Sequence, residues 1–364
     1  MLLRFNQIKK IDWVLLVAVL LLVLVGLLSI YSVSQQEGAR FFKRQLIYVV
    51  LGIALMMIFT MLDYRIFRDH SYILIFLYFF GVLLLLAVLF IGKEVRGASS
   101  WLSIGGIGFE PVEFVKLVII LMLAKYFSLR HIEVHRIKYL VVSALYVIIP
   151  LILLLLQPEL GYVLILALIW LAIVLVAGIR IKHLIILGII AVLLFSLGWS
   201  YALKDYQKQR VLSFLDPHAD PLGSGYNIIQ SIIAIGSGKI FGRGLGQGTQ
   251  SQLNFLPEPH TDFIFASIAE EWGFVGSALV LLLFGIMLFR IIRNSLGSTN
   301  NFARLFCVGV AVMFVLQAVI NIGMNMGLFP IVGIPLPLIS YGGSNLIMNF
   351  VALGIVQSIV TRNK

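Results

Sequence analysis

Residues 71–91 read S-Y-I-L-I-F-L-Y-F-F-G-V-L-L-L-L-A-V-L-F-I, an apolar run without a charged side chain. A helix needs roughly 20 predominantly apolar residues to cross the hydrocarbon core of a bilayer, so this stretch predicts a membrane span. Similar runs recur along the chain in both directions. About ten spans are expected from length and apolar character, over residues 12–32, 46–62, 71–91, 111–128, 139–156, 161–178, 183–200, 264–289, 303–327 and 344–361.

The composition points to the same class. Hydrophobic residues make up 61% of the 364 residues, and only 12% are charged. No soluble domain of this size can hide so much apolar surface, so we expect an all-α, polytopic integral membrane protein. A single transmembrane domain over residues 1–364 is predicted. The lone cysteine, Cys307, lies in a predicted span, so an intramolecular disulfide is excluded.

The distribution of basic residues predicts the orientation. With both termini in the cytoplasm, the cytoplasmic segments carry more Lys and Arg than the outside segments, as the positive-inside rule requires. The first outside loop runs against this bias, because it holds Arg40, Lys43 and Arg44. The net charge of +11 fits the bias and an affinity for anionic lipid, so no nucleic-acid partner is predicted.

Three segments on the outside differ from the short loops elsewhere. Residues 201–262 form a long segment rich in Gly, Pro, Asp, Gln and Ser, and structureless loops of such length are uncommon unless they are functional. Residues 94–110 have the same Gly-rich, polar character. The prolines within 327–344 forbid a continuous helix, and irregular backbone at membrane depth survives only where it is buried in protein or lines a cavity. Any chemistry is therefore predicted on the outside face.

A cluster of ionisable residues lies where the long outside segment enters a span. Residues 254–274 read N-F-L-P-E-P-H-T-D-F-I-F-A-S-I-A-E-E-W-G-F. Burying ionisable groups in a membrane span costs free energy, so such a cluster indicates a functional site. The alternative is that these residues are the solvated end of a loop. Because Asp262 is followed at once by Phe-Ile-Phe, the functional interpretation is favoured. Glu270 and Glu271 would lie roughly 12 Å deeper in a regular helix, so we expect them to support the site.

The fourth span carries its own charged face. Glu110, Glu113 and Lys116 recur at intervals of three and fall on one side of a helix. Such a face should look into the bundle or into a water-filled cleft. An internal ion pair that only locks helices together is the alternative, since structural pairs are common.

The residues match a known family at this point. The chain resembles the SEDS proteins (shape, elongation, division and sporulation), polytopic peptidoglycan glycosyltransferases. The family usually has Q-P-S-E where this chain has E-P-V-E at 110–113, which leaves the role of Glu110 open. The resemblance rests, in the order of the family, on R-G-A-S-S-W-L at 96–102, E-P-V-E-F-V-K at 110–116, Q-P-E-L-G at 157–161, Q-R-V-L-S-F-L-D-P at 209–217, G-S-G-Y-N-I-I-Q-S-I-I-A-I-G-S-G at 223–238, G-T-Q at 248–250, F-L-P-E-P-H-T-D-F-I-F-A at 255–266 and G-I-P-L-P-L-I-S-Y-G-G-S at 333–344.

The resemblance implies a substrate and roles for individual residues. The substrate is lipid II, a disaccharide-peptide on a polyprenyl diphosphate, and Asp262 is the implied general base. The diphosphate requires cations to neutralise its charge. Lys116, held in place by Glu113, and Arg210 from the loop are expected to supply them. A divalent cation, Mg²⁺ or Mn²⁺, near Asp262 or Glu113 could share this role. Glu258, His260 and Thr261 are expected to contact substrate, and Trp101, Ser340, Tyr341 and Gly342 to support the loops.

The resemblance also implies partners and a location. A class B penicillin-binding protein is expected as crosslinking partner, because no S-x-x-K motif appears in the outside loops. Other membrane proteins of the elongation machinery are expected as well, in the bacterial cytoplasmic (inner) membrane with the active site outside. The short tails and residues 321–330 resemble the elongation branch more than the division branch. A lipid II flippase without chemistry is the alternative, but the inner halves of most spans are plain Leu, Ile, Val and Phe.

Overall fold

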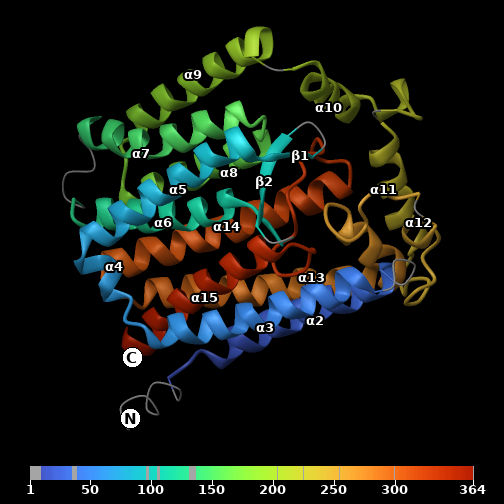
Figure 1. The fold of residues 1–364 in the computed structure, drawn as a ribbon, viewed down its shortest axis with the longest axis horizontal. Helices are drawn as coiled ribbons and strands as arrows, with labels where there is room; N and C mark the ends of the chain where they lie inside the picture. Colours follow the sequence, from blue (N-terminus) through green and yellow to red (C-terminus); the bar gives the residue numbers. More distant parts are fainter. Residues whose placement is uncertain are drawn as a thin grey trace.

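The structure is a computed structural model, and it describes residues 10–34, 39–95, 98–104, 107–130, 137–202, 204–223, 225–253, 255–298 and 300–363. Arg96, which opens the R-G-A-S-S-W-L motif, and Asn254, which opens the ionisable stretch, lie outside the described residues. The long helices form one bundle (Figure 1). The start of α2 and the end of α15 lie at one end of this bundle, and the segment from α10 to α12 lies at the other.

The long helices match the predicted spans closely, and the all-α class is confirmed. Their bounds are α2 Trp13–Val33, α3 Arg40–Met61, α5 Ser71–Ile91, α6 Pro111–Ser128, α7 Ile137–Leu156, α8 Leu160–Ala177, α9 Ile181–Leu197, α13 Ile264–Leu296, α14 Asn301–Asn325 and α15 Gly343–Asn363. Short helices are α4 Arg65–Asp69, α10 Asp205–Leu215, α11 Tyr226–Ser237 and α12 Thr249–Gln252, with a π-helix at Gly198–Ala202 and a 3₁₀-helix at Pro217–Ala219.

Nine of the helices in the described part of the chain are long and apolar enough to cross a membrane. The remaining predicted span, α6, differs from these nine because it carries three charged residues, Glu113, Lys116 and Lys125, all of them buried. Helix α6 packs against α5, α7, α8, α14 and α15, so its charged side chains are enclosed by protein. This is the environment that charged residues within a span require.

The structure corrects three expectations about the segments between spans. Arg40, Lys43 and Arg44 do not lie in a loop, because α3 begins at Arg40 rather than at residue 46. Residues 201–262 are not a structureless loop, since they hold α10, the 3₁₀-helix, α11 and α12. Residues 94–110 contribute to a small antiparallel sheet in the order β1-β2-β3, with β1 Lys93–Val95, β2 Ala98–Ile104 and β3 Ile107–Phe109. Hydrogen bonds within these short helices and strands thus satisfy the backbone N–H and C=O groups of segments that were predicted to be loops.

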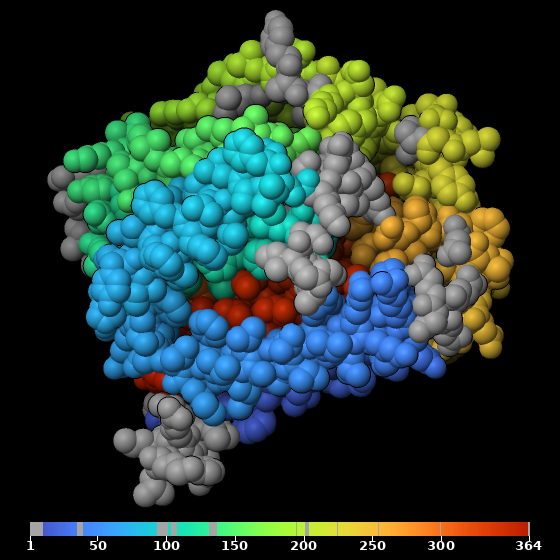
Figure 2. Space-filling view, viewed as in Figure 1, coloured from blue at the N-terminus to red at the C-terminus, as the bar shows by residue number. Residues whose placement is uncertain are grey.

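Helix α15 is the central element of the bundle. Most of it is buried, and it packs along the length of α3. Gly354 makes this close approach feasible, because a Cβ there would lie 2.7 Å from the carbonyl oxygen of Met56. The space-filling view shows part of α15, in red, between α3 and α5 (Figure 2). Helix α9 is the opposite case, since its apolar side chains are largely exposed, as expected for a lipid-facing span.

Candidate active site

A cavity of about 1210 Å³ opens at the end of the bundle that carries α10 to α12. It is larger than the roughly 300–1,000 Å³ of a typical small-molecule pocket, so it can hold a sizeable polar group. The ends of α2 and α3 meet there with β2, the start of α6, the corner before α8, helices α10 and α11, and the segments 256–263 and 330–345. All but the first of these include segments singled out from the sequence.

Asp262 lines this cavity and is partly exposed. It belongs to a turn directly before α13, in which the backbone N–H groups of Thr261 and Phe263 donate to the carbonyl of Glu258 at 3.1 and 3.4 Å. The carboxylate faces Gly333, whose Cβ, if present, would lie 3.8 Å from Asp262 Oδ2. Gly333 has a φ of +69°, a conformation that disfavours any side chain there. Space beside the carboxylate is therefore kept open.

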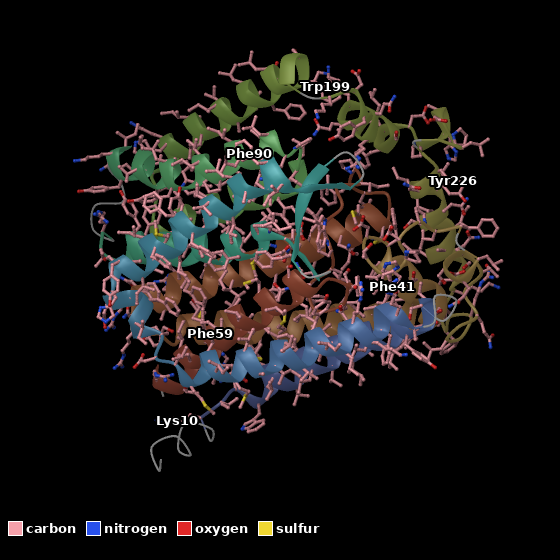
Figure 3. The ribbon with its side chains drawn as sticks, viewed as in Figure 1. Lys10, Phe41, Phe59, Phe90, Trp199 and Tyr226 are labelled. Atoms are coloured by element: carbon pink, nitrogen blue, oxygen red, sulfur yellow. The ribbon has the colours of Figure 1, made fainter. Side chains whose placement is uncertain are left out.

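The predicted substrate residues Glu258, His260 and Thr261 share the turn with Asp262 and line the same cavity. Thr261 Oγ1 donates to Glu258 Oε2 at 3.3 Å, and His260 Nε2 lies 3.6 Å from that same oxygen. The His260 ring stacks on Phe41 with 4.0 Å between centroids. Figure 3 shows Phe41 at the end of α3 nearest the α10–α12 segment. Phe41 could not be predicted from the sequence, because a phenylalanine at the edge of a span carries no signal of its own.

Two of the predicted support residues, Ser340 and Tyr341, contact the Asp262 turn. Ser340 Oγ donates to the carbonyl of Thr261 at 2.7 Å, and the Tyr341 N–H donates to the carbonyl of His260 at 2.9 Å. Gly342 N–H donates to Gln45 Oε1 at 3.3 Å, which attaches this loop to α3. Burial raises the pKa of the Tyr341 hydroxyl above its ordinary value, so it stays protonated as a donor at neutral pH.

Trp101 and Arg210 reach the cavity from two other elements. Trp101 comes from β2 and lines the wall. A Cβ at Gly108, on the paired strand β3, would lie 2.9 Å from the Trp101 ring, so glycine is needed there. Arg210 comes from α10, is exposed, and lies over the Tyr206 ring at 5.6 Å. The sheet and α10 thus bring an aromatic and a cationic side chain to one cavity.

Glu113 and Lys116 form a buried ion pair with 2.7 Å between Oε2 and Nζ. The Tyr162 hydroxyl donates to the other oxygen of Glu113 at 3.0 Å, and Lys116 Nζ lies 5.1 Å from the centre of the Tyr162 ring. Tyr162 and Glu110 line the cavity, whereas Lys116 is fully buried behind them. The structure therefore places Lys116 one residue layer away from the cavity and does not bring it beside Arg210. Its contact with substrate stays a prediction.

Glu270 and Glu271 of α13 have a structural role, because they bind the segment around α12. Glu270 accepts from the N–H groups of Gln250 and Ser251 at 2.9 and 3.0 Å. Glu271 accepts from Ser32 Oγ at 2.5 Å and from the Gly246 N–H at 3.2 Å. Both carboxylates are buried and neither lines the cavity, so they fasten the segment before α13 onto that helix.

The predicted divalent cation has no preformed site of its own in the described part of the chain, where no three His, Cys, Asp or Glu side chains gather. Cations that prefer oxygen ligands, such as Mg²⁺, often take part of these ligands from substrate phosphates and water. Asp262 and Glu258, on one turn of the cavity wall, offer the carboxylates that such a cation would share with a diphosphate. The cation remains a prediction.

Comparison with known proteins gives a consistent picture. The chain is 38% identical over 356 residues to stage V sporulation protein E of Bacillus subtilis strain 168, covering 96% of each. It is 36% identical over 353 residues to peptidoglycan glycosyltransferase MrdB of Escherichia coli strain K12, covering 97% of this chain and 94% of that protein.

Two solved structures share the fold. One belongs to a peptidoglycan synthase complex described as coordinating polymerization and crosslinking; it has 36% identity, a TM-score of 0.82, and coverage of 97% of this chain and 98% of that one. The other is the rod shape determining protein RodA of Thermus thermophilus, with 31% identity, a TM-score of 0.71 and 97% coverage of both. The family model described as cell cycle protein, for FtsW, RodA and SpoVE, matches residues 10–364. The chain therefore belongs to the FtsW/RodA/SpoVE family.

Proposed function

We propose that this protein is a peptidoglycan glycosyltransferase that polymerises lipid II at the outer face of the cytoplasmic membrane, for cell elongation and shape. Glycosyltransferase is the activity named for the Escherichia coli relative, and rod shape determination is the role named for the Thermus thermophilus protein. The observation that carries the proposal is the position of Asp262. It lies on a turn at the wall of a large cavity, and that turn is held by loop residues Ser340 and Tyr341.

The proposed reaction is a single inverting displacement. The acceptor sugar hydroxyl attacks the anomeric carbon of the donor, forming the glycosidic C–O bond. The bond between that carbon and the diphosphate oxygen breaks, and the polyprenyl diphosphate leaves with the electron pair. Asp262 takes the proton of the acceptor hydroxyl as general base. A diphosphate is a good leaving group, so cations rather than a strong general acid are required.

Arg210 is the cation best placed for the diphosphate, since it lines the cavity and is exposed. The Glu113–Lys116 pair behind Tyr162 adds an electric field that water screens little, because both side chains are buried. Aromatic side chains at the wall, Trp101 and the stacked pair Phe41 and His260, suit the apolar faces of sugar rings. We propose that the polyprenyl tail lies along the surface of the bundle where α15 is visible between α3 and α5 (Figure 2).

Crosslinking must come from another protein on the same face. The structural relative in a complex that coordinates polymerization and crosslinking supports such a partner. We propose a class B penicillin-binding protein for this role. Multi-pass membrane placement follows from the nine candidate spans in the described residues. The outward orientation of the cavity is part of the proposal; it is supported by the predicted cytoplasmic termini, because the start of α2 and the end of α15 lie opposite the cavity end (Figure 1).

Polymerisation of purified lipid II by the Asp262→Asn variant tests the proposal. A positioned general base is typically worth about 10²–10⁴ in rate, so we expect a loss of that order. Asn is close in size to Asp, so folding and lipid II binding should be retained. The Asp216→Asn variant is the matched control, because Asp216 caps the 3₁₀-helix away from the cavity. Near-normal polymer from Asp262→Asn would refute the role of Asp262 as base.

A further inference from the structure

The turn that carries Asp262 is bound through three consecutive carbonyl oxygens. The carbonyls of His260 and Thr261 accept from the 340–341 loop, as described above. The carbonyl of Asp262 itself accepts from two side-chain amides of α14: Asn321 Nδ2 at 3.1 Å and Asn325 Nδ2 at 2.9 Å. The backbone that carries the proposed base is thus attached to two separate elements.

Asn321 and Asn325 are four residues apart and so lie on one face of α14. Both side chains are fully buried. Asn321 Nδ2 also donates to the carbonyl of Ile334 at 2.8 Å, in the loop that contains Gly333. One amide therefore connects the Asp262 carbonyl to the loop that faces the Asp262 carboxylate.

Asn325 has a second contact with the same region. Helix α13 begins at Ile264, and its N-cap residue, Phe263, provides no side-chain cap. The first N–H groups of a helix need acceptors from outside the helix. Asn325 Oδ1 accepts from one of them, Ala266 N–H, at 3.2 Å. Asn325 therefore caps α13 from a neighbouring helix while it holds the carbonyl two residues before the helix begins.

The hydrogen-bonding capacity of these amides is almost fully used. An amide side chain offers two N–H donors and a carbonyl acceptor. Besides Asp262, Asn325 Nδ2 donates to the carbonyl of Asn321 at 2.8 Å. An apolar residue of similar size would leave the Asp262 carbonyl without these two donors in a buried setting. The turn would then settle in a different position.

We infer that Asn321 and Asn325 are positioning residues that fix the Asp262 carboxylate for proton abstraction. This inference rests on the proposed function, because it needs Asp262 to act as the base. Displacing a reacting group by about 1 Å can cost roughly 10²-fold in rate. The two asparagines act on Asp262 through its own peptide group and not through substrate, since neither lines the cavity.

The test is steady-state polymerisation by the full-length protein in detergent, with purified lipid II, for Asn321→Leu and Asn325→Leu. We expect kcat to fall about 10- to 100-fold in each, with KM for lipid II within about threefold of wild type. Gln317→Leu is the matched control. Gln317 is fully buried on the same helix, and in the described structure neither polar atom of its side chain has a hydrogen-bond partner. Its kcat should be close to wild type.

A purely structural role predicts a different pattern. The fraction of folded protein would fall, as measured by size-exclusion elution and thermal unfolding, while kcat per folded molecule stayed constant; that result would overturn the inference. Unchanged kcat in both Leu variants, or a raised KM alone, would overturn it too. If the Leu variants do not fold, Asn321→Ser replaces them, because one hydroxyl donor cannot serve both the Asp262 and the Ile334 carbonyl and kcat should still fall.

The Asp262→Asn result separates this inference from the proposed function. If Asp262→Asn polymerises normally, the proposed role of Asp262 fails whatever the asparagines do. If Asp262→Asn is inactive and both Leu variants keep wild-type kcat, only the positioning role fails.

Discussion

Two carboxylate–cation pairs, each with a buried carboxylate, lie at opposite ends of the bundle and differ in how completely they are bonded. At the end away from the cavity, Asp12 accepts from Arg290 Nε and Nη2 at 2.8 Å each and from Asn294 Nδ2 at 2.9 Å. Gln357 binds the backbone N–H and carbonyl of Asp12 at 3.0 Å each. Together with Gln357, this pair connects α2, α13 and α15.

The pair behind the cavity is bonded more sparsely. Lys116 Nζ contacts Glu113 Oε2 and, in the described structure, has no further hydrogen-bond partner. An ammonium group has three donors, so Lys116 keeps unused capacity close to the cavity wall. We propose that the saturated pair serves as a structural clamp and that the unsaturated pair keeps an electrostatic influence on a bound ligand. Three substitutions test that distinction.

Arg290→Met should have the largest effect and should act on stability. It leaves the Asp12 carboxylate buried without its cation, and breaking a buried pair in this way typically costs about 3–5 kcal/mol. Thermal unfolding in detergent should show a clear loss, with polymerisation per folded molecule unchanged. Arg293→Met, an exposed neighbour on the same helix, is the control and should unfold like wild type. A specific loss of kcat without destabilisation would show that the clamp is not purely structural.

Lys116→Met should act mainly on turnover. Removing one fixed positive group from a charge-stabilising site often costs about 10²-fold in kcat, so a reduction of up to that size is expected. Lys125→Met is the matched control, because Lys125 is also buried on α6 but lies at the far end of that helix. Equal turnover in the two variants would mean that the Glu113–Lys116 pair only locks helices together.

Tyr162→Phe should have a smaller effect in the same direction. It removes the hydroxyl that donates to Glu113, and one hydrogen bond to a charged group contributes about 1.5–3 kcal/mol. Since Lys116 stays in place, turnover should fall less than in Lys116→Met. Tyr78→Phe is the control, because that hydroxyl donates to a backbone carbonyl at 3.0 Å on other helices. A loss as large as that of Lys116→Met would place Tyr162 itself in contact with substrate.

The spans could be predicted from the sequence because the length of an apolar run is a local property of the chain. Helix α5 has the predicted bounds, and so does α6 despite its charges. The predicted start of α3 was wrong because charged side chains near the end of a helix do not themselves end it. The helices within 201–262 were missed because Gly, Pro and polar residues obscure short amphipathic helices.

The sequence by itself determined that the chain crosses a membrane, that its polar segments gather on one face, and that Asp262 stands where such a segment meets a helix. These properties depend on composition and order along the chain. Only the tertiary structure decided that Lys116 lies behind Tyr162, that Phe41 stacks on His260, and that two asparagines of α14 hold the Asp262 carbonyl. These contacts join residues far apart in the chain, and helix packing rather than local pattern sets which side chains meet.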